Sequence, residues 1–284
     1  MLDKLKNYIM LMRLNKPIGF FLLLWPTLWA LWLASSGMPP LNILIIFITG
    51  TLVMRSAGCI INDFADRHFD KYVERTRERP LTTGAVTVKE ALILFFILLS
   101  IAFVLVLFLN PLSIELAFIG AGLAIFYPYM KRFTHLPQVG LGTAFSWGVP
   151  MAFAATTNNV PTTAVILFFT ALIWPVIYDT QYAMTDRKDD LKLNLQSTAI
   201  LFGQWDKIII GLLQIIFLLM LSWVGYLFQL TTYYYLSLIL VAILFIYQQR
   251  LIYTRLPKNC FRAFLNNHWV GLIIFLGIAA SYTL

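Results

Sequence analysis

Long apolar stretches alternate along this chain with short polar breaks. Within each stretch the apolar residues are continuous rather than alternating with polar ones, which indicates helices instead of the strands of a barrel. Taking about 20 residues per membrane span, the pattern predicts about nine helices, at 17–37, 42–64, 89–109, 112–130, 136–155, 162–183, 207–228, 233–251 and 264–283. Three prolines fall inside these spans and should kink them, namely Pro26, Pro150 and Pro175.

Composition agrees with this pattern. Hydrophobic residues make up 60% of the chain, charged residues only 12%, and the mean hydropathy is +0.79. Soluble domains average about 25% charged residues, so we predict an all-α integral membrane protein in which residues 1–284 form one domain. Cys59 lies in an apolar run and Cys260 in a basic loop, so we expect two structural thiols rather than a disulfide.

The basic residues predict the orientation of the chain in the membrane. All 21 Lys and Arg residues fall in the amphipathic segment Met1–Lys16, at Arg55, or in every second connection, and none falls in the connections between. Cytoplasmic loops carry an excess of Lys and Arg, so the N-terminus should be cytoplasmic and the C-terminus outside. We expect Met1–Lys16 to lie at the membrane interface. The net charge of +8 therefore reflects topology and does not indicate a nucleic-acid partner.

Two acidic motifs stand at the predicted cytoplasmic ends of spans. Asn62, Asp66 and Asp70 recur every four residues, so on a helix they would form one slanting stripe. A matching set follows much later, at Tyr182, Asp186 and Asp190. Asp179 lies two helical turns before Asp186, the middle acid of this set. Like charges at this spacing repel, so a stripe of oxygen donors favours a bound cation, Mg²⁺ or Ca²⁺ rather than Zn²⁺. The repeat predicts one site shared by two copies of a unit; the alternative is two solvated loops whose acids only balance bases.

Several basic residues near these motifs have two interpretations each. Arg55 lies two turns deeper than Asn62, where a cation needs a partner, so it either pairs with Asp66 or Asp179 or forms the floor of a pocket for an anionic group. Lys131, one turn after Tyr127, either snorkels to lipid phosphates or binds a substrate phosphate. Three arginines lie between the predicted spans 42–64 and 89–109, namely Arg75, Arg77 and Arg79. We expect them to serve at least in part as topology determinants and lipid contacts.

Facing carboxylates with basic neighbours suit a diphosphate held through Mg²⁺. The metal and the basic side chains would neutralise the charge that builds on a departing diphosphate. A diphosphate on the cytoplasmic side of a protein embedded in lipid implies a substrate with a long apolar tail, such as a prenyl diphosphate. Loss of diphosphate leaves an allylic cation, which an electron-rich aromatic ring can attack. The sequence has no serine near a His–Asp pair, which disfavours a hydrolase. It has no glycine-rich phosphate loop, which disfavours a nucleotide-binding protein.

These motifs resemble the UbiA-type membrane prenyltransferases over nearly the full chain. The resemblance rests on Asn62-Asp63-x-x-Asp66-Arg67-x-x-Asp70, Arg79-Pro80-Leu81, Tyr127-x-x-x-Lys131, Asp179-x-x-Tyr182-x-x-x-Asp186-x-x-x-Asp190 and the opening Arg13-Leu14-Asn15-Lys16-Pro17. Within the family, the second motif and Lys131-Arg132-x-Thr134-His135-x-Pro137-Gln138 are most similar to the members that prenylate 4-hydroxybenzoate in ubiquinone biosynthesis.

The resemblance implies a fold of nine helices around a central cavity that opens sideways into the bilayer. It implies a Mg²⁺–diphosphate cage of Asn62, Asp66, Asp70, Asp179, Asp186 and Asp190. It also implies diphosphate contacts at Arg79, Tyr127, Lys131 and Arg132, and an aromatic-substrate site at Arg55, Asn62 and Tyr182. Asp66, Asp186, Arg79 and Lys131 would then be the catalytic residues, and the enzyme would use polyprenyl diphosphate and 4-hydroxybenzoate at the cytoplasmic face of a bacterial inner membrane.

Two alternatives stay open at this point. A sister enzyme could keep the cage and prenylate another acceptor, such as dihydroxynaphthoate, homogentisate or haem. A cation-coupled transporter is a different class, since acids within a membrane often line ion paths. A transporter needs acids near mid-bilayer, whereas these cluster at one interface, and Arg55 would repel cations.

Overall fold

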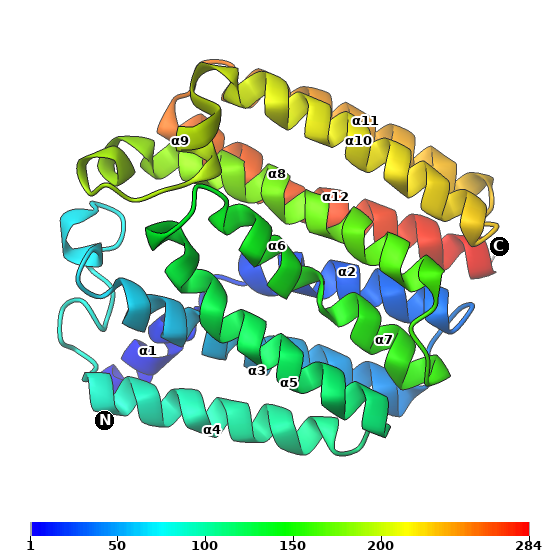
Figure 1. Ribbon diagram of the computed structural model, residues 1–284, viewed down its shortest axis with the longest axis horizontal. Coiled ribbons are helices and arrows are strands. Elements are labelled where there is room, and N and C mark those ends of the chain that lie inside the picture. Colours follow the sequence, from blue (N-terminus) through cyan, green and yellow to red (C-terminus); the bar gives the residue numbers. More distant parts are fainter. Residues whose placement is uncertain (1, 284) are drawn as a thin grey trace.

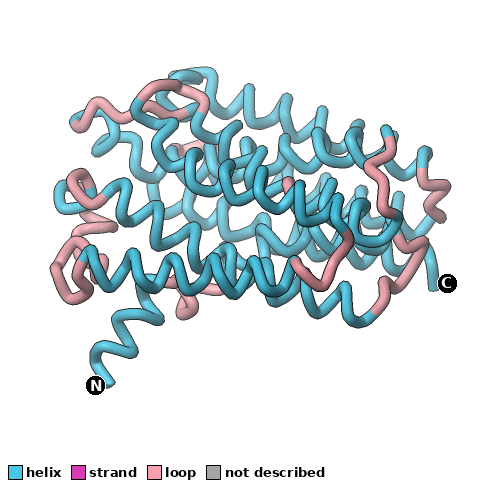
Figure 2. The backbone as a smooth tube through the Cα atoms, turned by 60° about the horizontal axis from the view of Figure 1, so that its bottom comes forward, coloured by secondary structure: helices cyan, strands magenta, loops and turns pink. Residues whose placement is uncertain are grey.

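The computed structural model describes residues 2–283, and these residues form helices joined by short connections, without a strand (Figures 1 and 2). The α-helices are α1 Leu2–Leu11, α2 Ile18–Ala34, α3 Leu41–Asp66, α4 Val88–Val106, α5 Pro111–Phe126, α6 Pro137–Ser146, α7 Gly148–Thr157, α8 Thr162–Lys192, α9 Thr198–Phe202, α10 Asp206–Leu227, α11 Thr232–Ile252 and α12 Pro257–Thr283. Short 3₁₀ helices lie at Asp70–Tyr72 (η1), Tyr127–Arg132 (η2) and Gly203–Trp205 (η3).

The long helices run roughly side by side as one bundle (Figure 1). In residues 2–283, seven helical segments are long and apolar enough to cross a membrane, and α2 is a shorter apolar helix of 17 residues. The pair α6 and α7 accounts for the remaining expected span. Each of the predicted spans therefore has a counterpart, and the all-α membrane fold is confirmed.

The span expected at 136–155 is broken at Trp147 into α6 and α7. Pro150 explains the position of the break, because it has no N–H to donate to the carbonyl of Ser146 one turn earlier. The indole Nε1 of Trp147 donates to the carbonyl of Leu116 on α5 at 2.7 Å, so the broken region is attached to a neighbouring helix. Pro26 and Pro175 lie within α2 and α8, which continue past them.

Helices end and begin in the gaps between the predicted spans, and capping explains two of these boundaries at the end of the bundle where the C-terminus lies. The side chain of Asn110 accepts a hydrogen bond from the N–H of Ser113 at 2.9 Å, and Pro111 occupies the first turn of α5, where no N–H is needed. Asn158 ends α7 in the left-handed conformation, with φ of 50°, which asparagine tolerates better than most residues.

Two groups of buried apolar side chains hold the bundle. The larger joins α2, α7, α8, α10, α11 and α12, and includes the fully buried Trp29 and Trp174. The smaller joins Leu11 of α1 to α3, α4 and the loop between them. Hydrogen bonds between buried amide side chains connect helices of the larger group. Gln181 donates to Gln248 at 3.0 Å and accepts from Asn267 at 3.0 Å.

Candidate functional site

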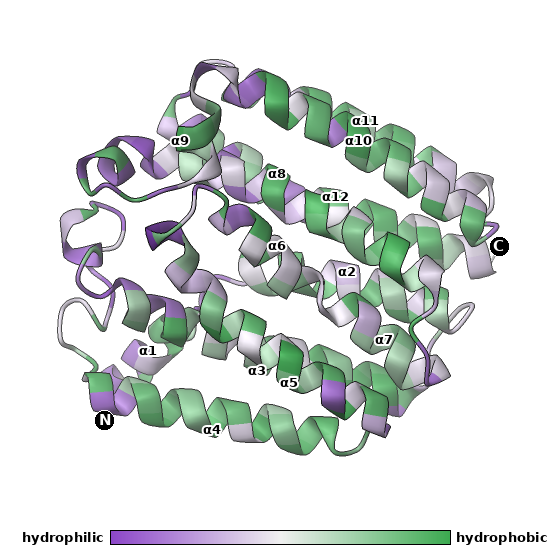
Figure 3. Cartoon of the chain, in the orientation of Figure 1, coloured by the Kyte–Doolittle hydropathy of each residue, from purple (hydrophilic) through white to green (hydrophobic). Residues whose placement is uncertain are grey.

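The most hydrophilic loops gather at one end of the bundle, at the left in Figure 3, and we call this the basic end. It contains α1, the loop between α3 and α4, η2, and the connection from α8 to α10. The N-terminus lies at this end and the C-terminus at the opposite one (Figure 1). Both acidic motifs belong to the basic end, as their neighbouring charges predicted.

The first acidic motif lies across the end of α3. Asn62 and Asp66 are helical, but Asp66 is the last residue of α3 and Asp70 begins the separate helix η1. The expectation of one continuous helical stripe is therefore wrong for Asp70. The turn is stabilised by contacts that a straight helix would not allow, since the Asp70 carbonyl accepts from Thr76 Oγ1 at 2.9 Å and its carboxylate from Arg79 at 2.8 Å.

The second acidic motif is a true helical stripe. Asp179, Tyr182, Asp186 and Asp190 all lie on α8, which is one helix of 31 residues, and all four are half-buried. The prediction of a stripe at i, i+4 and i+8 is confirmed here.

Basic side chains join the two motifs into one site. Arg75, from the loop after the first motif, binds Asp186 with both its Nε and Nη2 atoms, and the shortest of these contacts is 2.5 Å. Lys131 Nζ lies 2.5 Å from Asp66 Oδ2. The backbone of η2 is also tied to the segment after α8, because Gln196 N donates to the Lys131 carbonyl at 3.0 Å. The two motifs are thus brought together at the basic end, and their role as one shared binding site stays a prediction.

A second set of ion pairs fixes the loop of the first motif. Arg79 Nη1 lies 2.8 Å from Asp70 Oδ2 and 3.0 Å from Asp63 Oδ1. Asp63 also binds Arg13, just after α1, at 2.7 Å. Asp63 and Arg13 both belong to motifs that carry the family resemblance, but the sequence predicted neither a site role for them nor their pairing. The pairing joins the start of the chain to the site.

Burial affects the charges in this loop. Burial raises the pKa of the Asp70 carboxyl, and the guanidinium of Arg79 opposes that rise. Burial acts to lower the pKa of Arg75, but Tyr182 and the hydrogen bonds and charge of Asp186 raise it above its ordinary value. Arg75 therefore stays charged. It was not predicted as a site residue because nothing in the sequence distinguishes it from Arg77.

The site can accept a metal ion only together with a further ligand. Within residues 2–283, no three His, Cys, Asp or Glu side chains lie close enough to hold one ion. Asp66 Oδ1, however, is buried and has no hydrogen-bond partner. Mg²⁺ usually takes one or two carboxylates and fills its remaining positions with phosphate oxygens and water. The hard oxygen donors at this site therefore fit Mg²⁺ that is bound together with a diphosphate.

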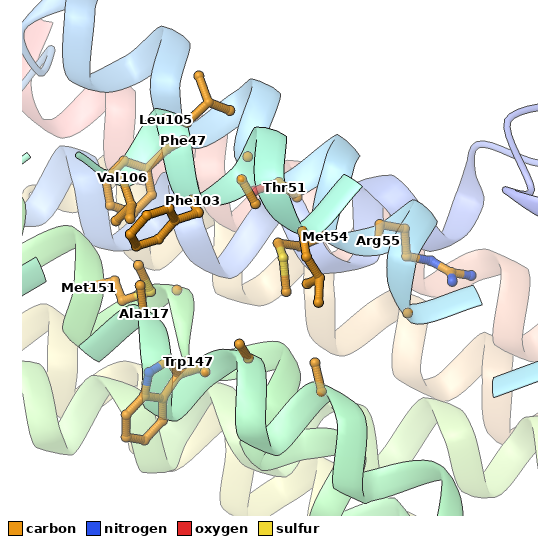
Figure 4. Close-up of a pocket in the computed structure, with 18 of the residues that line it drawn as sticks. Phe47, Thr51, Met54, Arg55, Phe103, Leu105, Val106, Ala117, Trp147 and Met151 are labelled. Carbon is orange, nitrogen blue, oxygen red and sulfur yellow. The ribbon is translucent and has the colours of Figure 1, made fainter. Parts of the chain in front are cut away.

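A cavity of about 600 Å³ lies within the bundle, between α2, α3, α4, α5, α6 and α7. Its walls are mostly apolar, with Phe47, Phe103 and Met151 at one end and Arg55 at the other (Figure 4). Tyr127, the first residue of η2, also lines it.

Arg55 has no carboxylate partner among the described residues. One guanidinium nitrogen donates to the sulfur of Cys59, and Nε is buried without any hydrogen-bond partner. An ion pair with Asp66 or Asp179, the first of the two interpretations of Arg55, is therefore not found. Its place in the wall of the cavity agrees with the second, a pocket for an anionic group.

Two further expected site residues have definite neighbours. The ring of Tyr182 lies 4.7 Å from the guanidinium carbon of Arg75 and 4.8 Å from the ring of Phe264. Arg132 donates to the carbonyl of Ala65 and lies over the ring of Tyr129 at 5.1 Å. Arg132 thus supports the end of α3, and its contact with a diphosphate stays a prediction.

Similar proteins give the family. The chain is 57% identical over 280 residues to the 4-hydroxybenzoate octaprenyltransferase of Coxiella burnetii (strain Dugway 5J108-111), covering 99% of this chain and 98% of the relative. The apo structure of a UbiA homolog from Aeropyrum pernix K1 has a TM-score of 0.80 at 24% identity, covering 92% of this chain and 97% of that one. A UbiA homolog from Archaeoglobus fulgidus bound to GPP and Mg²⁺ has a TM-score of 0.72 at 15% identity, covering 98% and 100%. The model of the UbiA prenyltransferase family matches residues 23–276, and this chain therefore belongs to that family, as its motifs predicted.

Proposed function

We propose that this protein transfers a polyprenyl group from polyprenyl diphosphate to 4-hydroxybenzoate, at the ring carbon ortho to the hydroxyl, with Mg²⁺ as cofactor. The product would be 3-polyprenyl-4-hydroxybenzoate, an intermediate of ubiquinone biosynthesis. One observation carries the proposal: two carboxylate motifs, neutralised by Arg and Lys, meet at the basic end, and the apolar cavity within the bundle contains an arginine without a carboxylate partner. The relative at 57% identity, whose name states the acceptor, supports it.

The diphosphate of the donor would bind at the basic end. Lys131 and Arg75 each neutralise one carboxylate, Asp66 and Asp186, and both basic groups can transfer to phosphate oxygens when a diphosphate enters. The released carboxylates are then free to hold the metal. Bound Mg²⁺ would supply charge neutralisation to the leaving diphosphate. The UbiA homolog from Archaeoglobus fulgidus that is bound to GPP and Mg²⁺ supports this pairing of ligands. The cavity would hold the first apolar units of the prenyl tail.

The acceptor would lie between this site and Arg55. The guanidinium would bind the carboxylate of 4-hydroxybenzoate, because a buried arginine otherwise lacks a compensating charge. This contact would orient the ring so that the carbon ortho to the hydroxyl faces the allylic carbon of the donor. The C–O bond to diphosphate breaks, the new C–C bond forms, and the ring loses its proton to the released diphosphate or to Asp66.

We also propose a bacterial inner membrane as the location, with the basic end facing the cytoplasm. The Lys and Arg residues fall, apart from Arg55, in the N-terminal segment and in every second connection, and this supports the orientation through the positive-inside rule. A cytoplasmic site suits both substrates, since 4-hydroxybenzoate is water-soluble and the diphosphate head of the donor is charged. No feature of this site requires another protein as a partner.

The test is prenyl transfer from octaprenyl diphosphate to radiolabelled 4-hydroxybenzoate in membranes, with and without Mg²⁺. We would compare wild type with Asp186→Ala and, as a matched control, Asp189→Ala, because Asp189 pairs only with the exposed Lys192. Product from wild type and the control, lost without Mg²⁺ and in Asp186→Ala, is expected. Product with another aromatic acceptor but none with 4-hydroxybenzoate would refute the proposed acceptor, and no product with any acceptor would refute the proposed reaction.

A further inference from the structure

The guanidinium of Arg55 lies against the backbone of Gly19, in the first turn of α2. A Cβ added to Gly19 would stand 2.7 Å from Cζ of Arg55, and nearer still to Nε and Nη2. Real Cβ atoms do not come so close to other heavy atoms, so any residue other than glycine would displace the guanidinium. Gly19 itself is buried and has an ordinary helical conformation, so its backbone does not require glycine. Space for Arg55 is the reason for glycine here.

The electrostatics of this contact favour an anion. The first N–H groups of a helix have no helical partner, and the N-terminus of α2 carries a partial positive charge. Arg55 places a full positive charge beside it, and the buried Nε of Arg55 has no hydrogen-bond partner among the described residues. Two positive groups that face each other in a buried site repel unless an anion binds both.

We propose that Gly19 is a specificity-determining residue for the aromatic acceptor: it makes room for Arg55, and the first turn of α2 with Arg55 binds the acceptor's carboxylate. This inference rests on the proposed function and adds to it a residue that touches no phosphate or metal. It predicts that Gly19 selects for acceptors with a carboxylate and has no effect on the donor.

Substitution of Gly19 should leave the fold intact. The atoms that a new Cβ would meet are the end of a long, flexible side chain rather than backbone, so Arg55 can rotate away at little cost. Alanine also has a higher helix propensity than glycine. The Gly19→Ala variant should therefore insert into membranes normally. Only the guanidinium of Arg55 should change its position.

The first experiment compares KM values of Gly19→Ala and wild type, with Gly122→Ala as the control. Gly122 is a helical glycine on α5, exposed, with no atom within 4 Å of an added Cβ. A displaced charge-assisted contact should raise KM for 4-hydroxybenzoate by about tenfold or more. We expect the KM for octaprenyl diphosphate to stay within about twofold, and Gly122→Ala to match wild type.

Two further comparisons separate this role from a structural one. In an Arg55→Met background, Gly19→Ala should have no additional effect, because the group that it displaces is gone. With methyl 4-hydroxybenzoate, which lacks the charge, Gly19→Ala and wild type should have similar KM values.

An unchanged KM for 4-hydroxybenzoate in Gly19→Ala, or an equal loss in the Arg55→Met background, would overturn the role of Gly19 and leave the proposed function standing. Failure of wild type to prenylate 4-hydroxybenzoate would overturn the proposed function and the inference with it.

Discussion

Asp206 is the charge whose removal should cost this protein the most stability outside the proposed site. Its side chain is 0% exposed, and it opens α10 at the basic end. Arg187 binds it at 2.9 Å from α8, and Arg255 binds it at 2.7 Å from the connection between α11 and α12. Asp206→Ala would leave two guanidinium groups facing each other without an anion. The substitution would also remove the partner of Arg187, the residue that follows Asp186.

The expected loss can be worked out from these exposures. Removing one partner of a buried pair costs about 3–5 kcal/mol. Arg187 and Arg255 are 23% and 35% exposed, so solvent relieves part of their charge and we expect about 2–3 kcal/mol. At roughly 2 °C per kcal/mol for a chain of this size, the thermal midpoint in detergent should fall by about 4–6 °C.

Asp189→Ala is the matched control, because Asp189 pairs with Lys192 through an exposed contact of 3.2 Å. Such surface pairs contribute at most about 1 kcal/mol, so its midpoint should shift by no more than about 2 °C. Thermal unfolding of both variants, followed by the fluorescence of a thiol-reactive dye on the two buried cysteines, measures the difference. Equal midpoints for Asp206→Ala and Asp189→Ala would refute the argument that burial of Asp206 decides its contribution.

Further changes at and near the site have expected results. Lys131→Met should lower kcat/KM for the prenyl diphosphate by about 100-fold, because it removes a cation from the leaving diphosphate; steady-state transfer assays measure this. Arg75→Met should raise KM for the donor about tenfold, and an unchanged KM would show that Arg75 stays on Asp186 throughout. Gln181→Leu should cost about 1–2 kcal/mol by leaving Gln248 and its neighbours partly unpaired, which thermal unfolding in detergent would detect; Gln181→Glu serves as a polar comparison. Treatment with EDTA should abolish transfer and added Mg²⁺ should restore it; activity that survives EDTA would contradict the metal requirement.

The spans were predictable because lipid leaves the backbone few choices. Each apolar stretch must satisfy its own hydrogen bonds, so its length and bounding residues nearly define a helix. Asn110 and Pro111 mark one such boundary, where the asparagine caps α5 and the proline occupies its first turn. The break at Trp147 was less evident, because a proline inside a membrane helix can kink it or end it depending on its neighbours. The contact of Trp147 with α5 is a tertiary feature that no local pattern indicates.

The acidic motifs were predictable as a pair but not in their detailed geometry. Spacing alone placed Asp186 and Asp190 on one face of α8, and that was right because nothing interrupts this helix. The same spacing was wrong for Asp70, since Thr76 and Arg79 bind it from a loop and turn the chain. These contacts come from residues whose sequence pattern, alternating Arg with Glu and Thr, gives no preference for one partner over another.

The structure distinguishes two carboxylates of the first acidic motif, Asp63 and Asp66, by their partners. Around the helix, Asp63 points about 100° from Asn62 and about 60° from Asp66, so helix geometry alone does not separate the two carboxylates and their partners must. Asp63 is bound by two guanidinium groups, of Arg13 and Arg79, whereas the carboxylate of Asp66 has one cation on one oxygen and nothing on the other. The carboxylate of Asp63, which is bound by two cations, has little capacity left to bind a metal ion. The carboxylate of Asp66 has a free oxygen that can bind one. We therefore interpret Asp63 as a structural counter-ion that holds the loop to the start of the chain, and Asp66 as the residue of this motif that is available to a substrate-bound ion.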